Sequence, residues 1–511
     1  MNIQKEKFCT AKAVVCATNE LGYDWDIIVP DMKPDIGKIL NSCAHVVISE
    51  KEIMQDRTVI SGIVKINILY VSSEDDKTIR NIENMQNFTH VMELKGLRQS
   101  MILDVSSCVA EITENVINSR KINLAVKIKL CGTAYNDENM EFISEAEEDD
   151  VHCLCKCINT IRTSCVTSND AVLKEEFDVP SGKPSVFEIL KVKTSITNKS
   201  VKPLLNKLVV KGNMVLSVLY NAELDGLKFE TMDFEMPFTE IFDIEGLTES
   251  SKCDTDFEIY DTNYFIKPNS DGDNRILVSE TVLRVRTRAY ENVCLNAVTD
   301  AYSITDNLKF ETSKYDIDEL LCEMCCDHQI KESVRFEALP PISKILNCAS
   351  TAEIVSAVIK NGKICVEGNV KTEVLYASID RDGFLNCAYF ETPFSAAFDC
   401  EEAKEGMYCE VNTDILSDGY NITGDFELQI RMNIQLNFRV KKSAECELFK
   451  SLDKDEDNPC ENTRADIVVY ICDGNETMWD IAKKYRTTTE RILTVNGLND
   501  EKIKYGTKLI V

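Results

Sequence analysis

The sequence has few of the residues, and none of the common motifs, on which most catalytic sites depend. Only four histidines occur, His45, His90, His152 and His328, and they do not correspond between the internal repeats described below. No Gly-x-x-x-x-Gly-Lys-Ser/Thr, Gly-x-Gly-x-x-Gly, His-Glu-x-x-His or Gly-x-Ser-x-Gly sequence is present. We therefore expect no catalytic residues and no cofactor, and we predict that the protein is not an enzyme.

Basic side chains are also scarce relative to acidic ones. Lys and Arg number 57 against 86 Asp and Glu, a formal charge of −29. Binding to nucleic acid or to anionic lipid needs a basic face, so neither is expected as a direct partner. No run of 18 apolar residues is present for membrane insertion, and residues 1–8 contain no apolar signal stretch. These absences predict a cytoplasmic protein.

Cysteine, by contrast, is abundant, with 22 residues. A large cytosolic protein does not need disulfides, so we expect reduced thiols that pack as small hydrophobic side chains. Residues 152–157 (His-Cys-Leu-Cys-Lys-Cys) and 322–328 (Cys-Glu-Met-Cys-Cys-Asp-His) carry the donor types that zinc uses. Neither segment has paired Cys-x-x-Cys knuckles, and Cys153, Cys155 and Cys157 would share one face of a strand. Plain thiols are therefore favoured over structural zinc, and no metal site is predicted.

The chain repeats itself at offsets of 150 and 156 residues. The segment 34–40 (Pro-Asp-Ile-Gly-Lys-Ile-Leu) recurs at 184–190 and at 340–346. The same offsets relate three further sets of landmarks: Gly62, Gly212 and Gly368; Tyr70, Tyr220 and Tyr376; Phe88, Phe238 and Phe394. Four landmarks in register over 54 residues indicate three copies of one domain.

Within each copy, apolar and polar residues alternate with a period of two. The segments 64–70, 215–220 and 370–376 are predicted strands, and so are the later segments 122–130, 282–290 and 426–438. Such alternation buries one face of a strand and leaves the other in water, which suits antiparallel sheets. The predicted fold is mainly β, with three tandem, sandwich-like β repeats at residues 1–150, 151–306 and 307–445.

Residues 446–465 are rich in charge and are predicted to form an acidic linker, and residues 466–511 to form a small module. The apolar residues Met478, Ile481, Ala482 and Tyr485 recur at helical spacing and predict a first helix. Thr487 with Glu490 predicts a capping box for a second helix that stops at 496–497 (Asn-Gly). Strands near 470–472 and 503–511 complete a βααβ order.

This module resembles a LysM domain. The residues on the family's pattern are Tyr470, Thr477, Trp479, Ile481, Ala482, Tyr485, Asn496, Gly497, Gly506 and Leu509. LysM domains commonly bind N-acetylglucosamine polymers between the first helical turn and the loop before the last strand. The resemblance implies binding residues at Asn475, Glu476, Thr477, Met478, Trp479, Asn496, Gly497, Leu498 and Ile503. The family's Gly-Asp-Thr opening reads Asn-Glu-Thr here, which weighs against peptidoglycan, and in some relatives the module binds protein.

Trp479 is the strongest single candidate for a binding residue. It lies about 100° round the helix from Met478, off the apolar stripe. We expect it either to be an exposed anchor for sugar or protein, or to pack on the edge of the small core.

Three β repeats followed by a LysM domain resemble the SipL-like clostridial spore coat morphogenetic proteins, whose repeat is called the SPOCS domain. The resemblance implies a non-enzymatic adaptor or scaffold for coat assembly during sporulation, in the mother-cell cytoplasm at the forespore surface. The implied partner is the coat-basement ATPase SpoIVA, engaged mainly through the LysM domain, with other coat proteins as further candidates. The alternative is a cell-wall protein that binds peptidoglycan through LysM.

Overall fold

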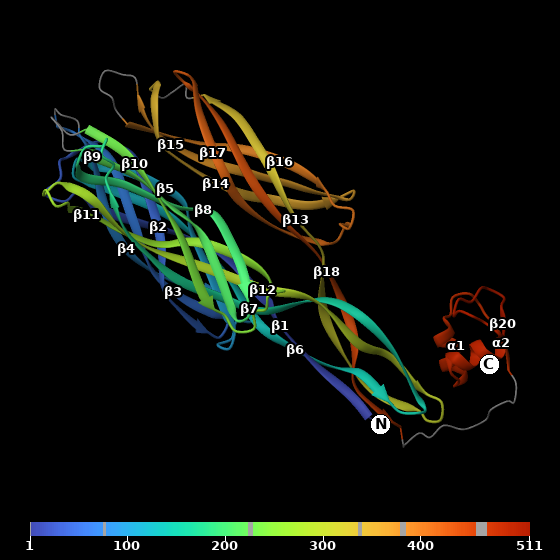
Figure 1. Cartoon of the computed structure of the whole chain (residues 1–511). Helices are drawn as coiled ribbons and strands as arrows, with labels where there is room; N and C mark the ends of the chain where they lie inside the picture. The colour runs from blue at the N-terminus through green and yellow to red at the C-terminus, as the bar shows by residue number, and fades with distance from the viewer. Residues whose placement is uncertain (1, 75–77, 223–227, 336–339, 379–384, 456–467) are drawn as a thin grey trace.

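The computed structural model of the chain describes residues 2–74, 78–222, 228–335, 340–378, 385–455 and 468–511. In this described part, each repeat contributes six strands, and the C-terminal module contributes two short strands and two helices. Neither helix is long and apolar enough to cross a membrane. Figure 1 shows the strands of the repeats gathered into one elongated body, with the C-terminal module beside one end of it.

The strand order is the same in every repeat. The first repeat consists of β1 (Asn2–Ile28), β2 (Ile36–Met54), β3 (Arg57–Ser72), β4 (Ile79–Glu93), β5 (Ile102–Asn118) and β6 (Lys121–Glu147). The second consists of β7 (Val151–Asp178), β8 (Val186–Leu204), β9 (Lys207–Ala222), β10 (Lys228–Asp243), β11 (Lys252–Pro268) and β12 (Asn274–Ser303). The third consists of β13 (Leu308–Arg335), β14 (Ile342–Lys360), β15 (Lys363–Ser378), β16 (Leu385–Asp399), β17 (Tyr408–Gly424) and β18 (Glu427–Lys454). The C-terminal module consists of β19 (Val469–Ile471), α1 (Met478–Tyr485), α2 (Thr489–Asn496) and β20 (Lys508–Ile510).

Each repeat is a sandwich of two antiparallel three-stranded sheets. In the first repeat the sheet orders are β1-β6-β5 and β2-β3-β4, and the other repeats have equivalent orders. The inward faces share one hydrophobic core, in which Ile60 and Val64 of β3 belong to the same cluster as Leu124 and Val126 of β6. The second and third repeats have corresponding cores. The mainly β, sandwich-like fold predicted from the sequence is confirmed.

The repeated tyrosines are buried hydrogen-bond donors at the end of the third strand of each repeat. The hydroxyls of Tyr70, Tyr220 and Tyr376 donate to the carbonyl oxygens of Pro34, Pro184 and Pro340, at 2.9, 3.2 and 3.1 Å. All three side chains are fully buried. A buried hydroxyl is costly unless it is hydrogen-bonded. Each tyrosine therefore ties the third strand to the segment that leads into the second.

The repeated glycines leave room for the repeated phenylalanines on the neighbouring strand. Gly62 of β3 pairs with Phe88 of β4. A Cβ added at Gly62 would lie 2.6 Å from the Phe88 ring and 2.4 Å from the carbonyl oxygen of Val47. The φ angle of Gly62 is not in the left-handed region, so backbone conformation does not require a glycine here. The close approach of Phe88 and Val47 does.

We predict that Gly62→Ala destabilises the first repeat by about 1–3 kcal/mol, the usual cost of overpacking a well-packed site. The matched control is Gly22→Ala in β1, where an added Cβ meets no atom within 4 Å and the expected change is within about 0.5 kcal/mol. Urea unfolding of the full chain measures both. Equal stabilities for the two variants would contradict the close-packing explanation.

The first and last strands of each repeat extend beyond their own sandwich. They are 27–30 residues long. Their outer halves meet in a shared hydrophobic cluster to which all three repeats contribute: Phe8, Met140, Phe142, Leu295, Ala297, Ile317 and Leu448. Figure 1 shows these strands leaving the sandwiches together toward the end where the N-terminus and the C-terminal module lie. We call this six-stranded extension, formed by β1, β6, β7, β12, β13 and β18, the stalk.

A second shared cluster joins the sandwiches themselves. Equivalent leucines from the three repeats, Leu69, Leu219 and Leu375, lie in it together with Leu40 and Leu190. The Lys191 ammonium of the second repeat donates to Asn41 of the first at 2.9 Å and to Glu373 of the third at 2.8 Å. The three repeats therefore pack around a common centre and are not independent domains arranged in a row.

A cluster of opposite charges links the second and third repeats. Arg439 contacts Asp254 at 2.6 Å and Glu410 at 3.4 Å, and Arg288 contacts the same two carboxylates at 3.2 and 3.1 Å. Burial acts to raise the pKa of Glu410, but Lys441 and the two arginines outweigh it and hold that pKa below its usual value. Breaking one such partly buried pair would leave an uncompensated charge, so the cluster fixes how the two repeats sit.

The predicted acidic linker begins too early. Residues 446–454 belong to β18, where Leu448, Phe449 and Leu452 are buried in the stalk. The sequence did not reveal the end of this strand, because it holds only a few closely spaced apolar residues before the run of charged ones. Residues 456–467 of the predicted linker lie outside the described residues. The predicted boundaries at 150/151 and 306/307 fall between β6 and β7 and between β12 and β13.

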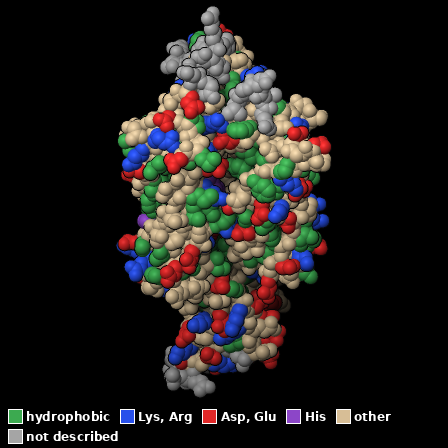
Figure 2. Space-filling view, turned by 90° about the vertical axis from the view of Figure 1, so that its left-hand side faces the viewer, with side chains coloured by type: hydrophobic (Ala, Val, Ile, Leu, Met, Phe, Trp, Pro, Cys, Tyr) green, Lys and Arg blue, Asp and Glu red, His purple; other side chains and the backbone are tan. Residues whose placement is uncertain are grey.

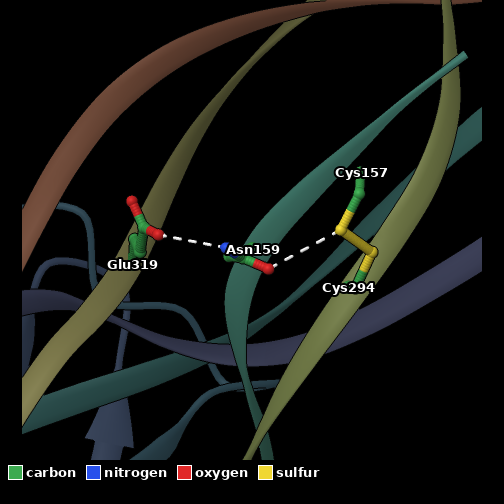
Figure 3. The surroundings of a disulfide bond; sticks show 4 residues. All are labelled: Cys157, Asn159, Cys294 and Glu319. Atoms are coloured by element: carbon green, nitrogen blue, oxygen red, sulfur yellow. Dashed lines mark hydrogen bonds between the residues drawn. A yellow bond between two sulfur atoms is a disulfide. The ribbon is translucent and has the colours of Figure 1, made fainter.

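The expectation that all the cysteines are reduced is wrong for one pair. Cys157 of β7 and Cys294 of β12 form a disulfide, with their Cα atoms 5.6 Å apart (Figure 3). Beside it, the Asn159 amide donates to Glu319 of the third repeat at 3.3 Å. The other cysteines among the described residues are free thiols, and most are at least partly buried.

Candidate binding site on the C-terminal module

Helix α1 begins at a reciprocal cap. The Thr477 hydroxyl accepts the Asp480 backbone N–H at 3.2 Å, and the Asp480 carboxylate accepts the Thr477 backbone N–H at 2.8 Å. These hydrogen bonds from the Thr477 backbone and hydroxyl hold the pKa of Asp480 below its usual value. The predicted apolar stripe is largely confirmed, because Met478, Ile481 and Ala482 are buried. Thr477, one of the predicted binding residues, therefore serves first to start the helix.

Helix α2 begins one residue later than predicted. Thr488, not Thr487, is its cap, and the Thr488 hydroxyl accepts the Arg491 backbone N–H at 3.0 Å. The shift arises because Arg486 ends α1 in the left-handed conformation, which leaves Thr487 in the connection. Gly497 ends α2 with φ +62°, as predicted. The βααβ order of the module is confirmed.

Several predicted binding residues have structural roles. Met478 is buried in the module core. The Asn496 side-chain amide donates to the Ile510 carbonyl oxygen and accepts the Ile510 backbone N–H, both at 2.8 Å. It thus forms the pair of hydrogen bonds that a neighbouring strand would form with β20. Leu498 and Ile503 pack half-buried against the core. Glu476 accepts the Tyr470 hydroxyl, and this hydrogen bond raises the Tyr470 pKa to about 12.

The two loops that would border a glycan groove lie together. A Cβ added at Gly474, before α1, would lie 3.1 Å from the Cβ of Tyr505, which precedes β20. The Gly506 backbone N–H donates to the Cys472 carbonyl oxygen at 2.9 Å. Asn475 is exposed here, and Tyr505 is 84% exposed. Sequence reasoning missed Tyr505, although an aromatic residue directly before the family's Gly506 was a usable signal.

Trp479 contacts the chain's own stalk instead of pointing into solvent. Its ring meets Tyr302 edge-on, with centroids 4.9 Å apart, and its indole N–H donates to the Asp300 carboxylate at 2.8 Å. Lys483, one turn further along α1, forms an ion pair with the other Asp300 oxygen at 2.5 Å. Both stalk residues lie on β12. Trp479 is therefore half-buried at the edge of the module's core, where that core meets Tyr302 of the stalk, as the second of the two expectations for it had it.

Two further contacts complete this junction. The Tyr302 hydroxyl donates to the Thr487 carbonyl oxygen at 2.8 Å, and burial raises the Tyr302 pKa to about 12. The Arg486 guanidinium donates to the Asp306 carbonyl oxygen at 3.0 Å and to the Asn307 side chain. No sequence pattern indicates Asp300 or Tyr302, because their contacts join residues 179 and 185 positions apart in the chain.

The sheet of the module carries an exposed apolar face. Val469 and Ile471 of β19 are each 59% exposed, and Ile510 of β20 is 43% exposed. Val469 pairs with Ile510, and side chains two apart on a strand point the same way, so the three share one face. We call these three residues the sheet face. It is separate from the α1 side chains that contact the stalk.

The fold and these surfaces define a tandem β-sandwich protein that carries a small βααβ binding module. Comparison with protein families agrees: the SipL, SPOCS domain model matches residues 35–117, 185–267 and 341–423, and the LysM domain model matches residues 475–511. The chain therefore belongs to the SipL-like proteins, with three SPOCS domains followed by a LysM domain. Neither the curated proteins nor the solved structures contain a significant match. The family places the chain among proteins associated with the spore coat.

We predict that Asp300→Ala releases the LysM domain from the stalk, because it removes the acceptor of both the Trp479 indole and the Lys483 ammonium. In a Trp25→Phe background Trp479 is the sole tryptophan, and its emission should shift to longer wavelength with increased quenching by acrylamide. The control is Asp271→Ala, in the exposed turn between β11 and β12. Unchanged emission in the Asp300→Ala variant would contradict the junction.

Proposed function

We propose that this protein is a non-enzymatic spore coat morphogenetic adaptor. It acts in the mother-cell cytoplasm and localises coat assembly to the forespore surface by binding the coat-basement ATPase SpoIVA. The LysM domain is the main docking module, and the three SPOCS domains form the body that carries it. The observation that carries this proposal is the exposed sheet face of the LysM domain.

The chemistry of the sheet face favours a protein partner over a glycan. Val469, Ile471 and Ile510 are β-branched hydrocarbon side chains with no polar atoms, whereas a sugar needs hydrogen-bonding groups around a stacking surface. Burying such side chains contributes about 25 cal/mol per Å² of apolar area, which supplies affinity without long-range charge attraction. The domain also already contacts protein through Trp479 and Lys483.

The surface charge supports docking by shape and apolar contact. On the side of the molecule in Figure 2, acidic and basic side chains are interspersed rather than gathered into one field. The LysM segment 466–511 contains equal numbers of acidic and basic residues, so the net charge of −29 resides upstream of it. Long-range repulsion of any other acidic protein is therefore smallest at this module.

A second candidate function is binding to peptidoglycan through the loops of the LysM domain. The observation that favours it is Tyr505, an exposed aromatic side chain next to Gly474, where a sugar ring could stack. The junction with the stalk leaves this tyrosine exposed.

Co-purification of the full-length chain with the coat ATPase tests the proposal. The double substitution Val469→Asp and Ile471→Asp should reduce binding at least about 10-fold, because an interface centre tolerates buried charge poorly. Tyr505→Ala is the matched control and should bind the ATPase normally. Circular dichroism verifies that each variant is folded.

Retention of the chain on insoluble peptidoglycan, lost in Tyr505→Ala but kept in the double variant, would instead favour the second candidate. Full ATPase binding by a chain that lacks residues 466–511 would move the docking surface to the SPOCS domains and contradict the proposed role of the LysM domain.

A further inference from the structure

Two thiols and a carboxylate meet at one edge of the core of the third repeat, and a third thiol, that of Cys409, lies in the same core. Cys322 of β13 and Cys409 of β17 both pair with Val440 of β18, so they flank it on the two neighbouring strands. Cys400, which directly follows β16 in the other sheet, places its Sγ 3.1 Å from the Cys322 Sγ. The Glu402 Oε2 lies 3.8 Å from the Cys400 Sγ.

These residues bring metal-binding atoms from two sheets into one place. One donor atom each from Cys322, Cys400 and Glu402 lies within 4.8 Å of the others. Within the part of the chain that the structure describes, no other group of three such donors lies as close together. Neither segment 152–157 nor segment 322–328 supplies such a group by itself among these described residues.

The other two repeats show what an ordinary core contains at these positions. In the first repeat, Ala134 is flanked by Val15 and Leu103. In the second, Ala289 is flanked by Cys165 and Cys253. The residue equivalent to Cys400 is Leu94 in the first repeat and Ile244 in the second, with the same backbone hydrogen bond to the preceding hairpin turn.

At these positions the third repeat thus carries one thiol more than the second repeat and three more than the first. All three apolar positions of the first repeat are thiols in the third, and Glu402 occupies the position of Gly96 and Gly246. Glu402 adds a carboxylate oxygen, a donor that zinc accepts, next to the thiols.

The local chemistry also suits a soft divalent cation. Zinc–sulfur bonds of about 2.3 Å place tetrahedral sulfur ligands about 3.8 Å apart, so the two sulfurs need to separate only slightly. Cys400 is 3% exposed, whereas Glu402 is exposed and leaves a path for entry.

We propose that Cys322, Cys400 and Glu402 bind one zinc ion, with Cys409 as the fourth ligand. Binding releases the thiol protons to solvent and joins β13, β17 and the segment after β16. The site closes the edge of the third sandwich where the first repeat uses packed hydrocarbon. It is independent of the LysM docking surface.

The test is the zinc content of the full-length chain after expression with zinc and purification without added metal. We expect one zinc per chain. The variant Cys322→Val, Cys400→Leu, Cys409→Leu, which restores the residues of the first repeat, should lose it while remaining folded. The control Cys165→Val, Cys253→Leu makes the same kind of change in the second repeat and should retain the zinc.

A second measurement keeps the test decisive if the triple variant fails to fold. In the unmodified chain, zinc should protect Cys322 and Cys409 from alkylation, and a chelator should abolish the protection. Folded, zinc-free protein with these thiols freely alkylated would overturn the proposal. So would a Cys322–Cys400 disulfide in a non-reducing digest, or equal zinc loss in the control variant.

Discussion

The structure depends on the need to bury the apolar face of strands that are longer than one sandwich. Strand β6 is buried at every second residue from Ile122 to Ala134 within its own repeat, and it is buried again at Met140 and Phe142 beyond it. The facing sheet of the same repeat, β2-β3-β4, is too short to cover that second stretch. Leaving it exposed would cost free energy and would present an edge open to aggregation. The outer halves of the long strands therefore bury one another in the stalk, which makes three sequence repeats into one folded unit.

This arrangement also determines where the LysM domain can lie. Each repeat starts and ends at the far end of the stalk, because its first and last strands are the two that form it. The chain therefore leaves the third repeat there, after Lys454, whose ammonium contacts Glu148 and Asp306 from the two turns between repeats, both at 3.0 Å. The LysM domain rests against the same end through Trp479 and leaves its sheet face open. The body formed by the three repeats thus presents one small module at its tip.

Local patterns predicted the elements well and their partners poorly. Alternation located the segments 64–70 and 122–130 within β3 and β6, and the landmark Tyr70 and Gly62 mark a buried hydrogen bond and a close packing site. The stalk could not be predicted, because alternation reveals a buried face but not whether its cover comes from another repeat. The same limit applies to the binding site. Helical spacing placed Trp479 off the core stripe, yet only the fold brings it to Asp300 and Tyr302. The disulfide between Cys157 and Cys294 likewise follows from the pairing of β7 with β12, which one-dimensional spacing does not contain.

The proposed docking surface for the coat partner is the LysM sheet face, and the SPOCS body is expected to stay unchanged on binding. Hydrogen–deuterium exchange of the full-length chain, with and without the coat ATPase, tests it most directly. We expect the partner to slow exchange at 469–471 and 508–510 and to leave the strands of the three sandwiches unaffected. Slowed exchange confined to the sandwich strands, with no change in the LysM domain, would contradict it.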